Sequence, residues 1–333
     1  MKRVKIAIVN SKSFGRYSSA IEELQKIGEV SRISIPKDAP GEELAARLEG
    51  FHFVVASVTP YYDRTFFERN KSVVMIARHG IGLDNIDLEA AKEHGVTIAR
   101  VPGSIERDAV AEHTINLMLL ALRSVHQAID AVKKGEWHAR SKFVGRQLSS
   151  CTVGVIGFGN IGSRVAEILI KGFGSKVLAY DPYVPPEVIK SIGAIPTSLE
   201  ELLSNSDIIT IHAKLTKESY HMIDEQAFQK MKNGVVIVNT SRGELVSVQA
   251  LLKALENGKV SAAALDVIEG EPIDESHPLL KFENIIITPH IVAYTYEALK
   301  GMDEFVVKAI ANYLEGKTLE EYAIIPPQPR KIS

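Results

Sequence analysis

The sequence predicts an α/β fold of two Rossmann-like, doubly wound parallel sheets with an active-site cleft between the two domains. Short apolar, β-branched segments alternate with helical segments along almost the whole chain. Continuous apolar strands that alternate with helices are typical of parallel sheets covered on both faces. The length of 333 residues also exceeds what one hydrophobic core usually organises, about 250–300 residues. Ligands commonly bind where two such domains meet.

The first series of strands lies in the N-terminal hundred residues. The expected elements are the strands VKIAIV (4–9), FVVAS (53–57), VVMIA (73–77) and VTIARV (96–101), with SSAIEELQKI (18–27) and LEAAKEHG (88–95) as helices. Val101-Pro102-Gly103 breaks this pattern. A long helix is expected from about Ser104 to Lys133, and Ser104 could cap it.

A second series begins at Cys151. Its expected strands are TVGVIG (152–157), KVLAYD (176–181), DIITIHA (207–213), GVVIVNT (234–240), VSAAALDV (260–267) and NIIITPH (284–290). After Thr295 a last helix is expected to run to about Leu314. The proline-rich end that follows should run extended over the surface.

Composition excludes several classes of protein. The formal net charge of −2 gives no reason to expect nucleic acid or an anionic membrane as a partner. The longest apolar run, INLMLLAL (115–122), is too short to span a membrane, and IAIV near the start is too short for a signal peptide. The single cysteine, Cys151, cannot form an internal disulfide, which is compatible with the expected cytoplasmic location. No histidine spacing predicts a metal site.

A glycine-rich segment, VGVIGFGNIGSRVAEIL (153–169), predicts a dinucleotide site. Gly157, Gly159 and Gly162 fit the pattern G-x-G-x-x-G between an apolar strand and an amphipathic helix. The first glycine permits the tight turn, the second lets the backbone approach the pyrophosphate, and the third lets helix and strand pack closely. The helix N-terminus, with Asn160 and Ile161 in its first turn, offers N–H groups to the phosphates.

Asp181 ends the next strand, about 20 residues further on, where an acidic residue binds the ribose hydroxyls of the adenosine. Its negative charge should repel a 2′-phosphate, so NAD is expected rather than NADP. The alternative is a residue that only forms the turn before Pro182.

Polar residues follow three later strands, in VNTSRGELV (238–246), ALDVIEGEP (264–272) and ITPHIVAYT (287–295). The carboxyl ends of strands in an open parallel sheet line the ligand crevice, so these residues are expected near the nicotinamide. They are Arg242, Asp266, Glu271 and His290.

These residue types suit the reduction of a 2-oxo acid. Arginine can hold the carboxylate through two parallel hydrogen bonds. Histidine can donate a proton to the oxygen as hydride reaches the carbon. A carboxylate beside the histidine would fix its tautomer and favour its protonated form, and Glu271 is the candidate, in competition with Glu269.

These motifs, with RHGIGLDNID (78–87) and VAEHT (110–114), resemble the D-isomer-specific 2-hydroxyacid dehydrogenases, including the 3-phosphoglycerate dehydrogenases and glyoxylate/hydroxypyruvate reductases. The resemblance implies that Arg242 binds substrate, that His290 is the acid/base with Glu271 as partner, and that Asp266 meets the nicotinamide carboxamide. It also implies that the N–H groups of Ile81 and Gly82 help hold the substrate carboxylate.

The resemblance further implies a discontinuous, flavodoxin-like substrate domain of residues 1–101 and 296–333, with an NAD-binding domain of residues 102–295 inserted. It implies a homodimer formed mainly through the NAD-binding domain. No further domain follows residue 333 in the sequence, so control through an added domain is not expected.

Three departures from the family pattern bear on the substrate and cofactor. Glu106 or a neighbour stands where an asparagine is frequent, and His79 stands where a small residue is frequent. Arg78 and His79 could favour a phosphorylated acid, which Glu106 would oppose. Lys214 replaces a proline near the expected adenosine and could soften the discrimination against NADP.

Two other functions compete with the dehydrogenase. One is an NAD-sensing, non-enzymatic binding protein of the corepressor kind. The intact set of Arg242, Glu271 and His290 argues against it. The other is a formate dehydrogenase, against which Glu271 argues because those enzymes carry glutamine at this position.

Overall fold

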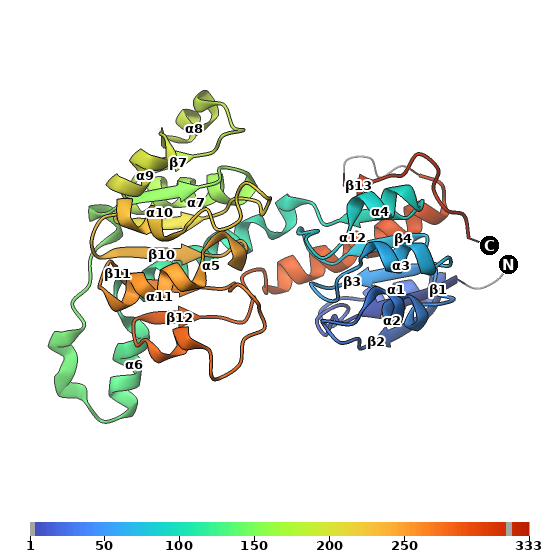
Figure 1. Cartoon of the computed structure of the whole chain (residues 1–333), viewed down its shortest axis with the longest axis horizontal. Helices are drawn as coiled ribbons and strands as arrows, with labels where there is room; N and C mark the ends of the chain where they lie inside the picture. The colour runs from blue at the N-terminus through green and yellow to red at the C-terminus, as the bar shows by residue number, and fades with distance from the viewer. Residues whose placement is uncertain (1–3, 318–321, 333) are drawn as a thin grey trace. The chain divides into compact units, whose positions relative to one another are not determined.

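The chain folds into two compact α/β units, which are described separately. The computed structural model describes residues 4–317 and 322–332. The first unit comprises Met1–Glu106 and Tyr294–Ser333, and the second comprises Arg107–Ala293. Each contains a mainly parallel sheet with helices on both faces, which confirms the predicted fold class (Figure 1).

The first unit contains a six-stranded sheet, among the described residues, in the order β13-β5-β4-β3-β1-β2. Its strands are β1 (Val4–Val9), β2 (Gly28–Ile33), β3 (Phe53–Ala56), β4 (Met75–Arg78), β5 (Thr97–Arg100) and β13 (Ala323–Ile324). All pair in parallel except β13, which lies antiparallel to β5. The parallel order 2-1-3-4-5 is that of a doubly wound sheet, and its winding reverses between β1 and β3. The edge strand β2, GEVSRI, was not predicted because it lacks a continuous apolar run.

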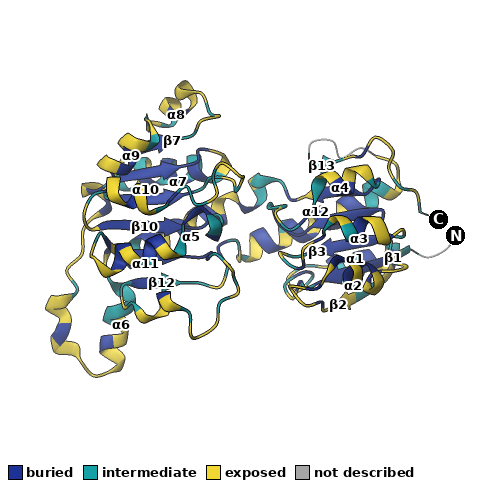
Figure 2. Cartoon of the chain, in the orientation of Figure 1, coloured by how far each residue is buried: buried dark blue, intermediate teal, exposed yellow. Residues whose placement is uncertain are grey.

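Helices cover both faces of this first sheet. They are α1 (Ala20–Ile27), α2 (Gly41–Arg47), α3 (Arg64–Arg69), α4 (Leu88–Glu93) and α12 (Tyr296–Leu314). Helices α1 and α12 pack on one face, and α2, α3 and α4 pack on the other. Helix α12 begins directly after Thr295, as the sequence predicted, and the Thr295 side chain caps it. The covered faces explain why the strands appear buried while the outer helix surfaces are exposed (Figure 2).

The second unit contains a seven-stranded, wholly parallel sheet in the order β12-β11-β10-β9-β6-β7-β8. Its strands are β6 (Thr152–Ile156), β7 (Lys176–Tyr180), β8 (Ile195–Pro196), β9 (Ile208–Ile211), β10 (Val235–Asn239), β11 (Val260–Leu265) and β12 (Ile285–Ile287). Counted from β6, the order is 3-2-1-4-5-6-7, and its first six strands have the order 3-2-1-4-5-6 of a dinucleotide-binding fold. The winding reverses between β6 and β9, and the adjoining carboxyl ends form the expected ligand crevice.

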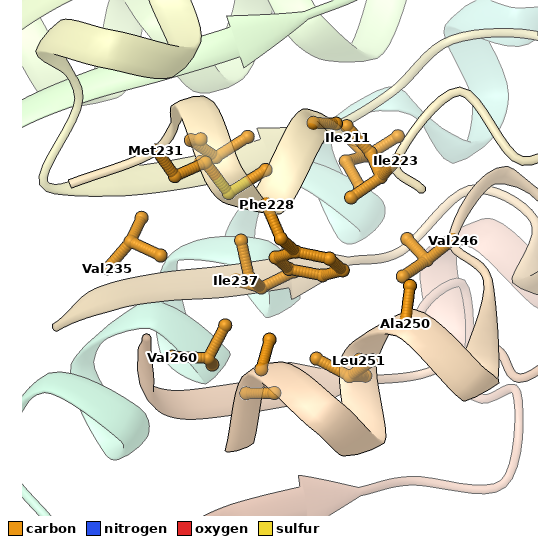
Figure 3. Packing of buried hydrophobic residues seen from close by; sticks show 14 of the residues in the cluster. Ile211, Ile223, Phe228, Met231, Val235, Ile237, Val246, Ala250, Leu251 and Val260 are labelled. Carbon is orange, nitrogen blue, oxygen red and sulfur yellow. The ribbon is translucent and has the colours of Figure 1, made fainter. Parts of the chain in front are cut away.

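Helices cover both faces of the second sheet as well. They are α7 (Asn160–Phe173), α8 (Pro186–Ile192), α9 (Leu199–Asn205), α10 (Glu225–Lys230) and α11 (Val248–Glu256), with the 3-10 turns η1 (Trp137–Lys142), η2 (Leu148–Ser150), η3 (Gly243–Leu245) and η4 (Pro278–Lys281). Helices α9, α10 and α11 build one hydrophobic core, where Phe228 lies among Ile237 and Leu251 (Figure 3). Helices α7 and α8 pack on the other face with part of α5 (Gly103–Leu122).

The long helix expected over residues 104–133 is in fact two helices. They are α5 (Gly103–Leu122) and α6 (Val125–Lys133). The break falls at Ser124, whose φ of 49° lies in the left-handed region and cannot continue a helix. Because α5 already begins at Gly103, Ser104 lies inside the helix, and its predicted role as the cap is wrong. Much of α6 and the segment after it is exposed (Figure 2).

The proline-rich end is tied down by one side chain rather than simply laid on the surface. The Arg330 guanidinium donates to the carbonyl oxygens of four residues, Phe67, Asn70, Val73 and His94. Its backbone N–H donates to Gly95 over 2.8 Å. Among the described residues, no helix is long and apolar enough to cross a membrane.

Candidate active site

The glycine-rich turn joins β6 to α7, as the sequence predicted. Gly157 has a φ of 89°, and a Cβ there would lie 2.5 Å from the backbone nitrogen of Ala213. A Cβ on Gly162 would lie 2.0 Å from the carbonyl oxygen of Gly157. Both glycines are therefore required by the fold itself, one for its conformation and both for close packing.

Gly159 differs from these two glycines. It is exposed at the N-terminus of α7, its φ is −75°, and a Cβ there would meet no atom within 4 Å. The fold does not need a glycine at this position, so the open space in front of it fits a group that approaches the backbone closely. Asn160 is also exposed and Ile161 is half-buried, which leaves the first turn of α7 accessible to a phosphate.

Asp181 follows β7 beside this turn. Its Oδ2 accepts a hydrogen bond from the N–H of Phe158 over 2.7 Å, and its Oδ1 accepts one from the N–H of Tyr183 over 2.9 Å. The carboxylate supports the glycine-rich turn through Phe158 and the turn after β7 through Tyr183, and Asp181 is still half-exposed. Asp181 can therefore form the turn and also bind the ribose. A carboxylate has lone pairs left for further donors.

His290 and Glu271 are in contact. The Nδ1 atom of His290 lies against Oε1 of Glu271, so the imidazole Nε2 is directed away from the carboxylate. The second oxygen of Glu271 accepts a hydrogen bond from the N–H of Ile268 over 3.1 Å. The two side chains are 29% and 35% exposed, which leaves the ring accessible to a small molecule. This is the arrangement of an imidazole acid/base held by a carboxylate.

Asp266 anchors the loop that carries His290. It is 1% exposed, and its two carboxylate oxygens accept hydrogen bonds from Thr288 Oγ1 (2.6 Å) and from the N–H groups of Ile291 (2.9 Å) and Val292 (2.8 Å). The backbone carbonyl of Asp266 also accepts from the N–H of His290. This anchoring role was not predicted, although Thr288, the threonine before Pro289, was a signal for it in the sequence.

Glu269, the competitor of Glu271, has other partners. Its Oε1 accepts from Tyr220 Oη (3.1 Å) and lies 2.8 Å from Nε2 of His221. The rings of Tyr220 and His221 are stacked with centroids 4.0 Å apart. The contacts thus distinguish the two glutamates. Glu271 contacts His290, whereas Glu269 ties the same loop to Tyr220 and His221. Sequence reasoning did not single out Tyr220 or assign a role to His221.

Arg242 follows β10 and is half-buried. Its Nη1 donates to the carbonyl oxygen of Ser241 over 2.6 Å, and its own carbonyl accepts from Asn239 Nδ2 over 2.8 Å. The backbone around the arginine is therefore fixed to the end of β10. Arg242, Asp266, Glu271 and His290 all follow the neighbouring strands β10, β11 and β12, as the sequence predicted for strand carboxyl ends.

Ile81 and Gly82 lie in the first unit, in the loop after β4, and both are half-buried. Among the residues 4–317 and 322–332, none accepts a hydrogen bond from either backbone N–H. Two adjacent unpaired N–H groups can bind an anion such as a carboxylate.

Most of the residues that bear on the departures from the family pattern have buried side chains. Arg78 is 5% exposed, and its Nη1 donates to the carbonyl oxygens of Ala56 (3.3 Å) and His79 (2.6 Å). The side chain of His79 is 4% exposed against Asp303. Glu106 is buried in the first turn of α5, and Lys214 is exposed. No group of metal-ligating side chains occurs in the part of the chain that the structure describes.

Residues 115–292 match the family model described as D-isomer specific 2-hydroxyacid dehydrogenase, NAD binding domain. The chain is 36% identical to a glyoxylate reductase of Thermococcus litoralis over 90% of this chain and 91% of the relative. It is 38% identical to a D-3-phosphoglycerate dehydrogenase of Archaeoglobus fulgidus over 92% of this chain. The chain spans only 57% of that relative, and 59% of a similar enzyme of Methanocaldococcus jannaschii.

Solved structures show the same likeness. A D-lactate dehydrogenase from Aquifex aeolicus, complexed with NAD and lactic acid, superposes with a TM-score of 0.85 and 31% identity, over 97% of this chain and 99% of that one. The apo D-lactate dehydrogenase of Escherichia coli gives a TM-score of 0.83 and 34% identity, over 97% and 100% of the two chains.

Proposed function

The chain belongs to the D-isomer specific 2-hydroxyacid dehydrogenase family, and we propose that it transfers a hydride between NAD and C2 of a small 2-oxo or D-2-hydroxy acid. The observation that carries this proposal is the contact between His290 and Glu271, beside the strand end that bears Arg242. The presence of Arg242, Glu271 and His290 together favours an enzyme over a protein that only senses NAD.

The cofactor fits the glycine-rich turn of the second unit. The open backbone at Gly159, with the first turn of α7, would hold the pyrophosphate, and Asp181 would hold the ribose hydroxyls. When bound, the nicotinamide accepts or supplies the hydride. The carboxylate of Asp181 also supports a preference for NAD over NADP, although exposed Lys214 could weaken that preference. We also propose a contact between Asp266 and the nicotinamide carboxamide.

The proposed partners of the substrate carboxylate are one cation, Arg242, and N–H donors. Arg242 offers a guanidinium suited to two parallel hydrogen bonds. The N–H groups of Ile81 and Gly82 offer two further donors. Hydrogen bonds to the carboxylate fix the orientation of the C2 carbonyl, so that the bound acid is aligned for the reaction.

His290 moves the proton at the substrate oxygen. In the reduction of a 2-oxo acid, its Nε2 donates a proton to the oxygen that gains charge, and in the oxidation it accepts that proton. Glu271 keeps Nδ1 as the bonded nitrogen, so Nε2 is the nitrogen that exchanges the proton. Asp266 contributes by fixing the backbone on either side of His290.

The substrate is best described as a small acid without a second anionic group, such as glyoxylate or hydroxypyruvate. The sequence left a phosphorylated acid open because Arg78 and His79 could bind a phosphate. Both side chains are buried and contact protein groups, which supports an unphosphorylated substrate. 3-Phosphoglycerate is the alternative substrate.

We also propose that the enzyme is a homodimer formed through the second unit. A groove of about 660 Å³ runs along α5 and α6 and is lined mainly by apolar side chains. Ile129 (48%), Val132 (52%) and Trp137 (72%) are highly exposed for residues of their size. A second copy of this chain would cover them. Light scattering should give a dimer for the wild type and a monomer for Val132→Asp, and a monomeric wild type would overturn this proposal.

A panel assay tests the proposed function. NADH oxidation is followed with glyoxylate, hydroxypyruvate, pyruvate, longer 2-oxo acids and 3-phosphohydroxypyruvate, and NADPH is used in parallel. We expect turnover with NADH and preference for glyoxylate or hydroxypyruvate. Preference for the phosphorylated acid would overturn the choice of substrate. Tight NADH binding without any turnover would instead favour the NAD sensor.

Two alanine variants test the cofactor site. Gly159→Ala should fold normally, because the Cβ has space, but should weaken NADH binding at least tenfold by filling the approach to the pyrophosphate. Gly162→Ala is the matched control and should destabilise the fold, because its Cβ would lie 2.0 Å from the Gly157 carbonyl oxygen. Normal NADH affinity in Gly159→Ala would contradict the proposed cofactor position.

A further inference from the structure

A histidine and a carboxylate lie together in the interior of the first unit, outside the proposed catalytic set. Nε2 of His79 is 2.9 Å from Oδ1 of Asp303, and the two side chains are 4% and 0% exposed. The atoms are within ion-pair distance but are not aligned as a hydrogen bond. Burying such groups costs free energy unless polar partners surround them, so the partners of each are informative.

The second oxygen of Asp303 reaches a different segment. Its Oδ2 accepts hydrogen bonds from the N–H of Gly15 over 2.9 Å and from Ser18 Oγ over 2.6 Å. Gly15 and Ser18 belong to the loop between β1 and α1, whereas Asp303 is on α12 and His79 follows β4. One buried carboxylate therefore joins three segments of the first unit that are distant in the sequence.

His79 is also fixed through its backbone and its ring. Its N–H donates to the carbonyl oxygen of Ala56 over 2.9 Å, and its carbonyl accepts from Arg78 Nη1 over 2.6 Å. The ring meets the edge of Phe14, with centroids 5.3 Å apart and planes at 82°. The backbone of His79 is thus fixed on both sides and its ring is packed against Phe14, so the main chain continues from His79 in a defined direction.

The loop that follows His79 carries the proposed carboxylate donors. Gly80, with a φ of 146°, accepts a hydrogen bond from Val101 over 3.2 Å. The next two residues, Ile81 and Gly82, have the N–H groups that no described residue accepts. A fixed residue two positions before Ile81 limits the directions in which these N–H groups can point. Fixed directions of the N–H groups are needed to align a bound substrate for the reaction.

We propose that His79 and Asp303 are positioning residues, which hold the loop of residues 79–82 so that its N–H groups bind the substrate carboxylate. The inference rests on the proposed function, because it concerns the binding of the same 2-oxo acid. It gives Arg78 and His79 a different role from direct contact with a substrate phosphate, since His79 acts through the backbone that follows it. His79 should therefore affect substrate affinity without contacting the substrate.

The test compares three variants of the full chain. His79→Leu removes the ring nitrogens at similar volume, and His79→Gln keeps an amide N–H that can reach Asp303. Tyr313→Phe is the matched control. It lies on the same helix as Asp303, and the substitution removes its hydrogen bond of 2.6 Å to the Arg330 carbonyl oxygen. For each variant, KM and kcat are measured with glyoxylate, NADH affinity by fluorescence, and Tm by thermal unfolding.

We expect His79→Leu to raise KM for glyoxylate about tenfold, the effect of losing roughly 1.4 kcal/mol of substrate binding, with NADH affinity unchanged. His79→Gln should restore KM to within about threefold of the wild type, a difference of about two thirds of the net contribution of one typical hydrogen bond. Tyr313→Phe should lower Tm and leave KM unchanged. A merely structural role would make KM follow Tm in all three variants, and that result would overturn the inference.

If His79→Leu does not fold, Ser18→Ala replaces it, because it removes one of the hydrogen bonds that orient Asp303. A raised KM in that variant supports the inference, and an unchanged KM overturns it. Failure of the proposed function is seen separately, because the wild type would then turn over no 2-oxo acid. An active wild type with an unchanged KM in the variants overturns only the positioning role.

Discussion

The two units each contain a histidine against a carboxylate, and the two pairs differ most in exposure. In the second unit His290 and Glu271 are 29% and 35% exposed, whereas in the first unit His79 and Asp303 are 4% and 0% exposed. An accessible imidazole can exchange a proton with a bound molecule, while an enclosed one can act only on the protein around it. The same chemical pair is therefore suited to a reaction in one place and to positioning in the other.

The largest expected effect is on the accessible pair. His290→Gln should lower kcat by about 10²–10⁴, the usual contribution of general acid–base catalysis. NADH affinity and Tm should stay at their wild-type values, because the side chain is partly exposed and lies outside the buried core. Stopped-flow or steady-state NADH oxidation measures the loss. Unchanged turnover would show that His290 is not the acid/base. The accessible pair would then have no catalytic role to set against the buried pair.

Glu271→Gln is the companion of that variant. Glutamine keeps an oxygen that can accept from the imidazole Nδ1 but carries no charge. The loss in kcat should therefore be smaller than for His290→Gln. A larger loss would mean that Glu271 has a role beyond orienting the ring.

The next effect concerns stability and should be larger in the buried pair than in the exposed one. Asp303→Leu leaves His79, the Gly15 N–H and Ser18 Oγ without their buried partner. Breaking a buried pair on one side usually costs about 3–5 kcal/mol of unfolding free energy. Glu271→Leu breaks a partly exposed pair and should cost about 1 kcal/mol or less. Urea denaturation followed by circular dichroism compares them, and equal losses would erase the distinction.

The sequence predicted the accessible pair better than the buried one, for physical reasons. Residues at the carboxyl ends of parallel strands converge on one edge, so apolar strand patterns were enough to group Arg242, Glu271 and His290. The partner of His79 is far away in the sequence, and only tertiary packing brings α12 to β4. A weak signal existed: Asp303 stands on the helical face that Leu299 and Val306 bury, where an acidic residue requires a partner.

The backbone conformations that break regular elements were equally hard to predict. The interruption at Ser124 has no glycine or proline to mark it, and its left-handed φ of 49° is apparent only in the structure. The edge strand β2 was missed because its exposed side chains remove the apolar run. By contrast, the strands of both cores follow the expected segments closely, since burial on both faces leaves few choices of residue.

The smallest expected effect tests whether the exposure of a histidine–carboxylate pair is enough to give it a catalytic role. His221 and Glu269 form a third pair, 30% and 29% exposed, nearly as accessible as His290 and Glu271. If exposure decided function, His221→Gln would damage turnover as severely as His290→Gln. We expect instead a loss of about 0.5–1.5 kcal/mol, the net value of one hydrogen bond, and so a decrease in kcat of about two- to tenfold. The reason is that Glu269 only supports the loop that carries Glu271. Parallel assays of both variants measure the difference, and equal losses would mean that the wrong histidine has been assigned as the acid/base.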